Sequence, residues 1–158
     1  MVRLLVVPGV VAALLVPAAA AALVPVPLVV QQAIKKRTSA LGYVPARLPF
    51  GFRYARWSYA ASPQPVTRIW FRRRLKPPSW QITFVASKQS GPCPRGEKSY
   101  QVDGNKVWWS HTRNEQQAWR CVAGPKGSVR LTAATPIPPT AFAAVGLAQV
   151  AAAGHRIR

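Results

Sequence analysis

TRIWFRRRLKPPSWQITF, residues 67–84, is the stretch that decides the fold of this chain. Its first half alternates at period two, with Ile69, Phe71 and Leu75 on one face and Arg68, Trp70, Arg72 and Arg74 on the other. A Pro-Pro pair then ends the strand, because proline cannot donate a hydrogen bond to a sheet. A second alternation follows, with apolar side chains at Trp80, Ile82 and Phe84. The pattern predicts two strands that each bury one face.

Short extended segments separated by turns occur on both sides of this stretch. An aromatic segment precedes it at 52–59, and later segments lie at 99–102, 107–110, 118–122 and 129–131. Asp103-Gly104 stands between two of them and is a favoured pair for a tight hairpin turn. Since strands joined by local turns pair antiparallel, the sequence predicts an antiparallel meander of about six or seven short strands.

The chain ends in a helical pattern. Residues 141–153 are rich in Ala, prolines precede them where a helix start tolerates proline, and Gly154 can end the helix. The segment is too short to span a bilayer, so we expect it to pack on one face of the sheet. An interfacial helix with its basic end toward lipid head groups is the alternative. The predicted fold class is α+β: an antiparallel meander with a C-terminal helix on one face, preceded by an N-terminal hydrophobic helix.

The N-terminal run, residues 4–30, is apolar and carries no charge. About 20 apolar residues suffice to cross a bilayer, so the run predicts a signal peptide or a membrane anchor. The alanine tract at 18–22 fits an export cleavage site in several registers, and four prolines disfavour a straight spanning helix. Export of the remaining chain is therefore the favoured interpretation.

A basic triplet, Lys35, Lys36 and Arg37, follows the run and favours the opposite orientation. By the positive-inside bias, an uncleaved anchor with this triplet would keep the rest of the chain in the cytoplasm. About 125 residues remain after the run, enough for one core. We expect four parts: a signal peptide or membrane anchor at 1–30, a basic connector at 31–48, a single sheet-plus-helix domain at 49–154 and a basic tail at 155–158.

The composition is strongly basic, with 22 Lys and Arg against three acids, Glu97, Asp103 and Glu115, and a formal net charge of +19. Such an excess favours an anionic partner: nucleic acid, acidic lipid head groups or a cell-wall polymer. A genome that favours Ala and Arg codons would produce the same excess without selecting any ligand.

The chain has two cysteines, Cys93 and Cys121. In an exported domain such a pair predicts one disulfide, whereas in a cytosolic domain it predicts two buried thiols. A disulfide would stabilise the fold by roughly 3 to 4 kcal/mol, because it restricts the unfolded chain.

Basic and aromatic side chains cluster in two neighbouring predicted strands. The members of this cluster are Arg53, Arg56, Trp57, Arg68, Trp70, Arg72, Arg73, Arg74 and Lys76. Guanidinium groups pair with phosphates and aromatic faces stack on bases, so the cluster is the candidate anion-binding site, for single-stranded nucleic acid, lipid phosphates or wall polymers. A solvated sheet face with Arg stems lying over Trp rings is the alternative.

Catalytic groups are scarce in this sequence. Ser110 and His111 with Asp103 resemble a triad only on paper, because adjacent strand residues point to opposite faces. The residues considered for zinc lack the short paired spacing of such sites: Cys93, Cys121, His111 and His155. There is no Gly-rich phosphate loop. We therefore expect a non-enzyme with no catalytic residues, cofactor or metal, and an enzyme of unknown class is the remaining alternative.

Four short motifs resemble those of a known family: LPFGF at 48–52, WQIT at 80–83, VDG at 102–104 and AWR at 118–120. With the last strand and the Ala-rich helix, the series resembles a bacterial extracytoplasmic domain of unknown function, attached to anti-sigma-factor or sporulation membrane proteins. That domain looks like the one-sided sheets of lipoprotein carriers and envelope-stress regulators. The resemblance covers roughly residues 45–152 and implies a sheet plus helix outside the membrane, with no chemistry.

The sequence thus predicts an exported or membrane-tethered, non-catalytic envelope or binding domain. Its expected partners are an anionic polymer, lipid head groups or an envelope protein. The alternative is a basic module that faces the cytoplasm and binds nucleic acid or anionic lipid through the Arg- and Trp-rich sheet face.

Overall fold

The computed structural model describes residues 24–73, 80–136 and 144–158. Seven strands in these ranges form one antiparallel sheet: β2 (Arg53–Ala60), β3 (Val66–Arg73), β4 (Trp80–Lys88), β5 (Lys98–Val102), β6 (Asn105–His111), β7 (Glu115–Gly124) and β8 (Gly127–Pro136). Two shorter strands, β1 (Tyr43–Pro45) and β9 (Gly154–Arg156), pair with each other. The described helices are α1 (Leu28–Thr38), the 3-10 helix η1 (Ser39–Leu41) and α2 (Ala144–Ala152). The fold is mostly antiparallel sheet with few helices, in agreement with the α+β prediction.

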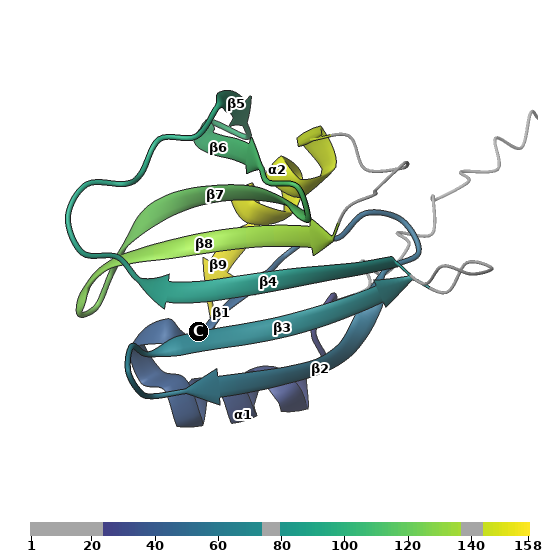
Figure 1. Ribbon diagram of the computed structural model, residues 1–158. Helices are drawn as coiled ribbons and strands as arrows, with labels where there is room; N and C mark the ends of the chain where they lie inside the picture. Colours follow the sequence, from purple (N-terminus) through teal and green to yellow (C-terminus); the bar gives the residue numbers. More distant parts are fainter. Residues whose placement is uncertain (1–23, 74–79, 137–143) are drawn as a thin grey trace, which may run out of the picture.

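The main sheet has the strand order β2-β3-β4-β8-β7-β6-β5 (Figure 1). The predicted local hairpins are present within β2–β4 and within β5–β8. The prediction of one continuous meander is wrong, because the chain crosses after β4 to the far edge of the sheet. It then returns strand by strand until β8 pairs with β4. The crossing segment, residues 89–97, carries Cys93, and the disulfide from Cys93 to Cys121 on β7 attaches it to the sheet.

The hairpin predicted at Asp103-Gly104 joins β5 to β6. Asp103 and Gly104 have φ angles of 49° and 75°. Positive φ at both central residues matches the twist of the flanking strands in a two-residue turn, which is why Asp-Gly is favoured there.

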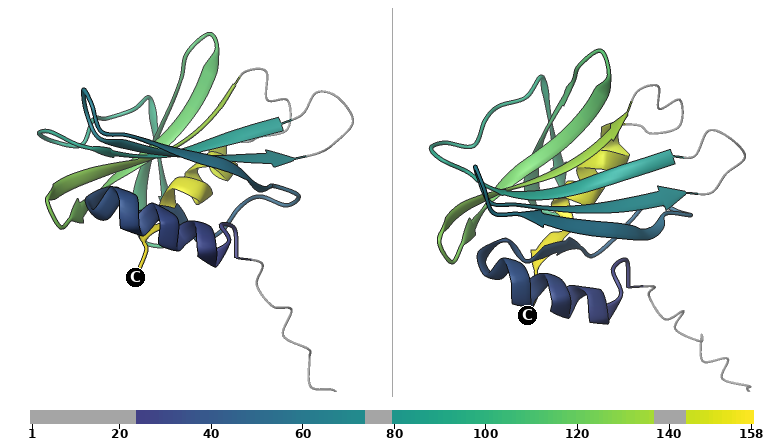
Figure 2. Two further views of the ribbon diagram at one scale, coloured as in Figure 1. Left: turned by 90° about the horizontal axis from the view of Figure 1, so that it is seen from below. Right: turned by 60° about the horizontal axis from the view of Figure 1, so that its bottom comes forward.

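One face of the sheet, here called the covered face, packs against α1, α2 and the β1–β9 pair (Figure 2). Its strands contribute fully buried apolar side chains, among them Ile69, Phe71, Ile82, Phe84 and Leu131. Leu147 and Val150 of α2 are also buried, so the predicted packing of the C-terminal helix on one face is confirmed. The opposite face, on which no described helix lies, is called the open face.

The segments that flank the predicted domain also contribute to its core. Ile34 of α1 and Val44 of β1 are buried, although residues 31–48 were expected to form a connector. Ile157 in the expected tail is buried beside β9. Residues 28–30 of the hydrophobic run begin α1, while residues 4–23 of the predicted hydrophobic helix lie outside the described part. In the described ranges, no helix has the length and apolar character needed to cross a membrane.

Candidate functional site

Most of the predicted basic cluster lies on the open face. The antiparallel register of β2 and β3 places Arg53 opposite Arg72 and Arg56 opposite Trp70, with Arg68 two positions further along. Trp57 instead lies opposite Ile69 and is half-buried against the core on the covered face. Arg73, next to Arg72 on β3, has its side chain beside Gly51, and Arg74 and Lys76 lie outside the described residues. The structure therefore groups five of the predicted site residues: Arg53, Arg56, Arg68, Trp70 and Arg72.

A hollow of about 420 Å³ lies in the open face over the middle of the sheet. Its floor consists of small side chains on β4 and β8: Thr83, Val85, Ser87, Thr132 and Ala134. Its borders are formed by larger side chains: Arg68 and Trp70 on β3, Glu115 and Gln117 on β7, and Arg130 on β8. Arg68 and Trp70 were predicted from the sequence, whereas the β7 and β8 residues were not, because no local pattern shows that β8 lies beside β4.

Three tryptophans of the open face each have a cation over the ring. Arg56 lies 4.2 Å from the ring centroid of Trp70, Arg130 lies 4.6 Å from that of Trp119, and Lys106 lies 4.5 Å from that of Trp108. Such contacts attract the cation to the electron-rich ring face. One stacking surface of each ring is therefore occupied by a side chain of the protein itself.

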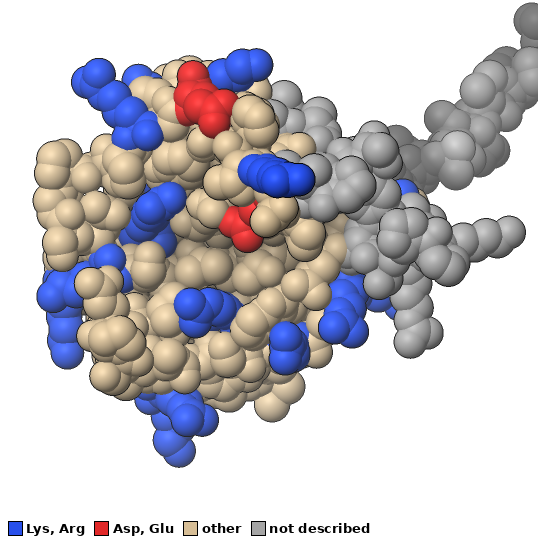
Figure 3. Space-filling model, in the orientation of Figure 1, with Lys and Arg blue, Asp and Glu red and all other residues tan. Residues whose placement is uncertain are grey.

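Each of the three acidic side chains of the chain has a partner other than Arg68 or Arg130. The end of the hollow that these two arginines border is therefore positively charged. Asp103 pairs with Arg47, Glu97 pairs with His111, and Glu115 accepts a hydrogen bond from Gln117. Neither Arg68 nor Arg130 forms an ion pair in the described part of the chain. Basic side chains outnumber acidic ones over this face (Figure 3).

Arg130 is held in place by its surroundings. It is half-buried, with its guanidinium over Trp119, and burial lowers the pKa of this group from its usual value. Its Nε atom is buried and has no hydrogen-bond partner among the described residues. A buried donor without a partner carries a desolvation cost.

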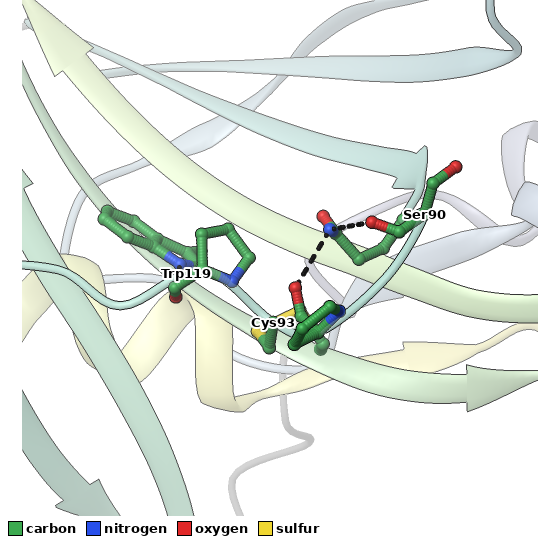
Figure 4. Close-up of a disulfide and its surroundings, with 7 residues drawn as sticks. Ser90, Cys93 and Trp119 are labelled. Atoms are coloured by element: carbon green, nitrogen blue, oxygen red, sulfur yellow. Dashed lines mark hydrogen bonds between the residues drawn. A yellow bond between two sulfur atoms is a disulfide. The ribbon is translucent and has the colours of Figure 1, made fainter.

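The disulfide predicted from sequence is present, with an S–S distance of 2.09 Å and a Cα–Cα distance of 5.8 Å. It fixes the crossing segment beside Trp119 (Figure 4), whose Nε1 donates a 2.9 Å hydrogen bond to the carbonyl of Pro94. Only 5% of Trp119 is exposed. A Cβ at Gly96 would lie 2.4 Å from the carbonyl oxygen of Trp109, so this position requires glycine. The crossing segment is thus a close-packed border of the open face.

The Ser-His pair considered for catalysis binds Glu97 and not Asp103. The carboxylate of Glu97 accepts hydrogen bonds from the Ser110 hydroxyl at 2.7 Å and from the His111 backbone at 3.2 Å, and lies 3.0 Å from His111 Nδ1. These hydrogen bonds, Ser110 first, lower the pKa of Glu97. Because Ser110 donates to Glu97, the pair lacks the nucleophile-to-base hydrogen bond of a triad. In the described ranges, no group of three His, Cys, Asp or Glu side chains could hold a metal.

No family model and no curated protein matches this chain in sequence. Among solved structures, the crystal structure of MucB in complex with MucA(peri) is similar to it, with a TM-score of 0.50 and 14% sequence identity. The match covers 72% of this chain and 36% of the other, so the chain spans about a third of its structural neighbour. This likeness concerns the fold, and it supports the one-sided sheet with helices that the sequence resemblance implied.

Proposed function

We propose that this chain is an extracytoplasmic, non-catalytic binding domain that takes an anionic ligand on its open face. The observation that carries the proposal is the hollow with Arg68 and Arg130 on its border, neither of which forms an ion pair with a described residue. Charged groups near a cleft without internal partners favour oppositely charged ligands.

The disulfide supports the extracytoplasmic part of the proposal. Disulfides persist in oxidising compartments and are rare in the cytosol. The Cys93–Cys121 bond lies on the open face and attaches the longest crossing segment of the sheet. The similar MucB structure is a complex with MucA(peri), which supports an envelope protein as a second candidate partner for this domain.

Topology tests the proposal directly. A phosphatase that is active only outside the cytoplasm, fused after Arg158, is expected to be active in a bacterial host, and denaturing thiol titration is expected to find no free thiol. The mature N-terminus, measured by mass spectrometry, separates cleavage near Leu23 from an anchor that keeps Met1. An inactive phosphatase together with two reactive thiols would contradict export.

The alternative is a basic module that faces the cytoplasm and binds nucleic acid or anionic lipid. It is favoured by the exposed basic triplet of α1, Lys35, Lys36 and Arg37. A second fusion at the same position decides between the two functions. If the domain faces the cytoplasm, a reporter that is fluorescent only in the cytoplasm is expected to be active there, and the phosphatase inactive.

A further inference from the structure

We infer that the hollow of the open face binds a polysaccharide segment in which a carboxylate-bearing sugar is flanked by neutral sugars. This inference rests on the proposed function and names its ligand class. It starts from the distribution of charge along the hollow, which differs between its two ends.

The register of the strands places the two arginines at one end of the hollow. Arg68 lies opposite Val85 and Arg130 lies opposite Ser87, so the two arginines belong to the strands on either side of β4. Guanidinium groups bind carboxylates through paired, charge-assisted hydrogen bonds. This end therefore suits a carboxylate of the ligand, which Arg68 can bind from β3 while the guanidinium of Arg130 lies over Trp119.

The lining of the other end of the hollow carries an acid and an amide, while Arg56 and Arg72 lie outside this lining at the same end of the sheet. Glu115 lies opposite Pro136, six residues along β8 from Arg130, which corresponds to about 20 Å of strand. Glu115 accepts a hydrogen bond from Gln117, and a carboxylate has further lone pairs for the hydroxyl groups of a ligand. A ligand with a charge on every unit, such as a nucleic acid, would place negative charge against Glu115.

The floor between these ends suits a chain that alternates hydroxyl groups with apolar patches. Thr83, Ser87 and Thr132 supply hydroxyls that both donate and accept, while Val85 and Ala134 supply small apolar surfaces. A lipid tail would leave these hydroxyls without partners. Single-stranded nucleic acid binds by stacking on open aromatic faces, whereas Arg56 occupies one face of the Trp70 ring and Trp119 is only 5% exposed.

An acidic peptide fits the hollow less well than a sugar chain. Extended peptides gain affinity by adding a strand to a free sheet edge. The hollow lies over β3, β4, β8 and β7, whose facing backbones are already paired with one another. The amides of a bound peptide would depend on side chains alone, while sugar hydroxyls pair readily with the Thr and Ser hydroxyls of the floor.

The test is a binding titration of the purified mature protein at physiological salt. The probes are hyaluronan oligosaccharides and gellan, which carry a uronate on every second or every fourth sugar, each compared with its carboxyl-reduced form. Poly-L-glutamate, an oligothymidylate and phosphatidylglycerol vesicles serve as anionic comparisons from other chemical classes. We expect at least one uronate polymer to bind, and its carboxyl-reduced form to bind about tenfold more weakly or worse.

Three variants assign binding to the hollow. Arg68→Ala and Ala134→Leu are each expected to weaken uronate binding about tenfold, the first by removing a carboxylate partner and the second by filling the floor without changing the charge. Arg37→Ala removes the same charge from exposed α1 on the other side of the sheet, and it is expected to leave binding unchanged. Circular dichroism of each variant checks that the sheet is folded.

The inference is overturned if no uronate polymer binds, if poly-L-glutamate or oligothymidylate binds more tightly, or if Arg37→Ala weakens binding as much as Arg68→Ala. Those results leave export untouched, because the phosphatase fusion reports on the compartment and not on the ligand. Conversely, an inactive phosphatase with intact uronate binding would contradict export while retaining the chemistry of the hollow.

Discussion

The two faces of the main sheet are built from the same strands but use opposite chemistry. On the covered face, Phe84 is fully buried beside β9, and a Cβ at Gly154 would lie 2.9 Å from the Phe84 ring. On the open face, the adjacent residue Thr83 forms part of the floor of a solvent-exposed hollow. The comparison indicates that stability is concentrated on the covered face, which leaves the open face free to be polar.

Truncation of neighbouring residues tests this division most strongly. Phe84→Ala is expected to lower the free energy of unfolding by about 3–5 kcal/mol, because a fully buried aromatic ring leaves a cavity in a close-packed core. Thr83→Ala, one residue away on the open face, is expected to cost less than about 1 kcal/mol. Urea unfolding measures both, and equal costs would refute the division between the faces.

Removal of the disulfide tests the main covalent link of the open face. The double variant Cys93→Ser with Cys121→Ser is expected to lose about 3–4 kcal/mol, because the bond closes a loop with a sequence separation of 28. Guanidinium unfolding of the oxidised protein and of the variant gives the difference. A loss below about 1 kcal/mol would show that packing of Pro94 and Gly96 already holds the crossing segment.

The third prediction concerns a polar residue on the covered face. Arg120 donates to the carbonyls of Ala151 and Gly154 at 3.2 and 2.7 Å and to Asn105 at 2.8 Å, which joins the end of α2 to the sheet. Arg120→Met is expected to cost about 1–3 kcal/mol, because these half-buried acceptors lose their donor. Hydrogen exchange of α2 should rise in this variant, and unchanged exchange would argue against such a role.

The smallest expected effect concerns pH. The folded pKa of Glu97 is lowered, chiefly by the Ser110 hydroxyl, so its contribution to stability is present above the ordinary pKa of 4.5 and is lost as pH falls through the folded pKa. Glu97→Gln removes this titrating group, so the loss of stability on acidification should become slightly smaller. Near pH 7 the slope of stability against pH should be the same in the variant and the unmodified protein. If the stability of the unmodified protein instead rises toward low pH, the prediction that folding lowers the pKa of Glu97 is wrong.

Local features of this fold could be predicted from the sequence, whereas the pairing of distant strands could not. Alternation at Ile69, Phe71, Ile82 and Phe84 predicted both strands and the buried face, because period two is a property of each strand alone. The Asp103-Gly104 turn was predicted for a similar reason. The insertion of β8 beside β4 was missed, since strand partners far apart in sequence leave no local pattern.

The candidate site divides in the same way. The basic side chains of β2 and β3 and the cysteine pair could be predicted from the sequence alone, because alternation along one strand and the number of cysteines can be read without knowing which strands pair. Only the tertiary structure placed Arg130 and Glu115 at opposite ends of one hollow and moved Trp57 to the covered face. The physical reason is that side-chain direction follows from strand register, and register across a crossing connection is fixed by packing of the whole sheet.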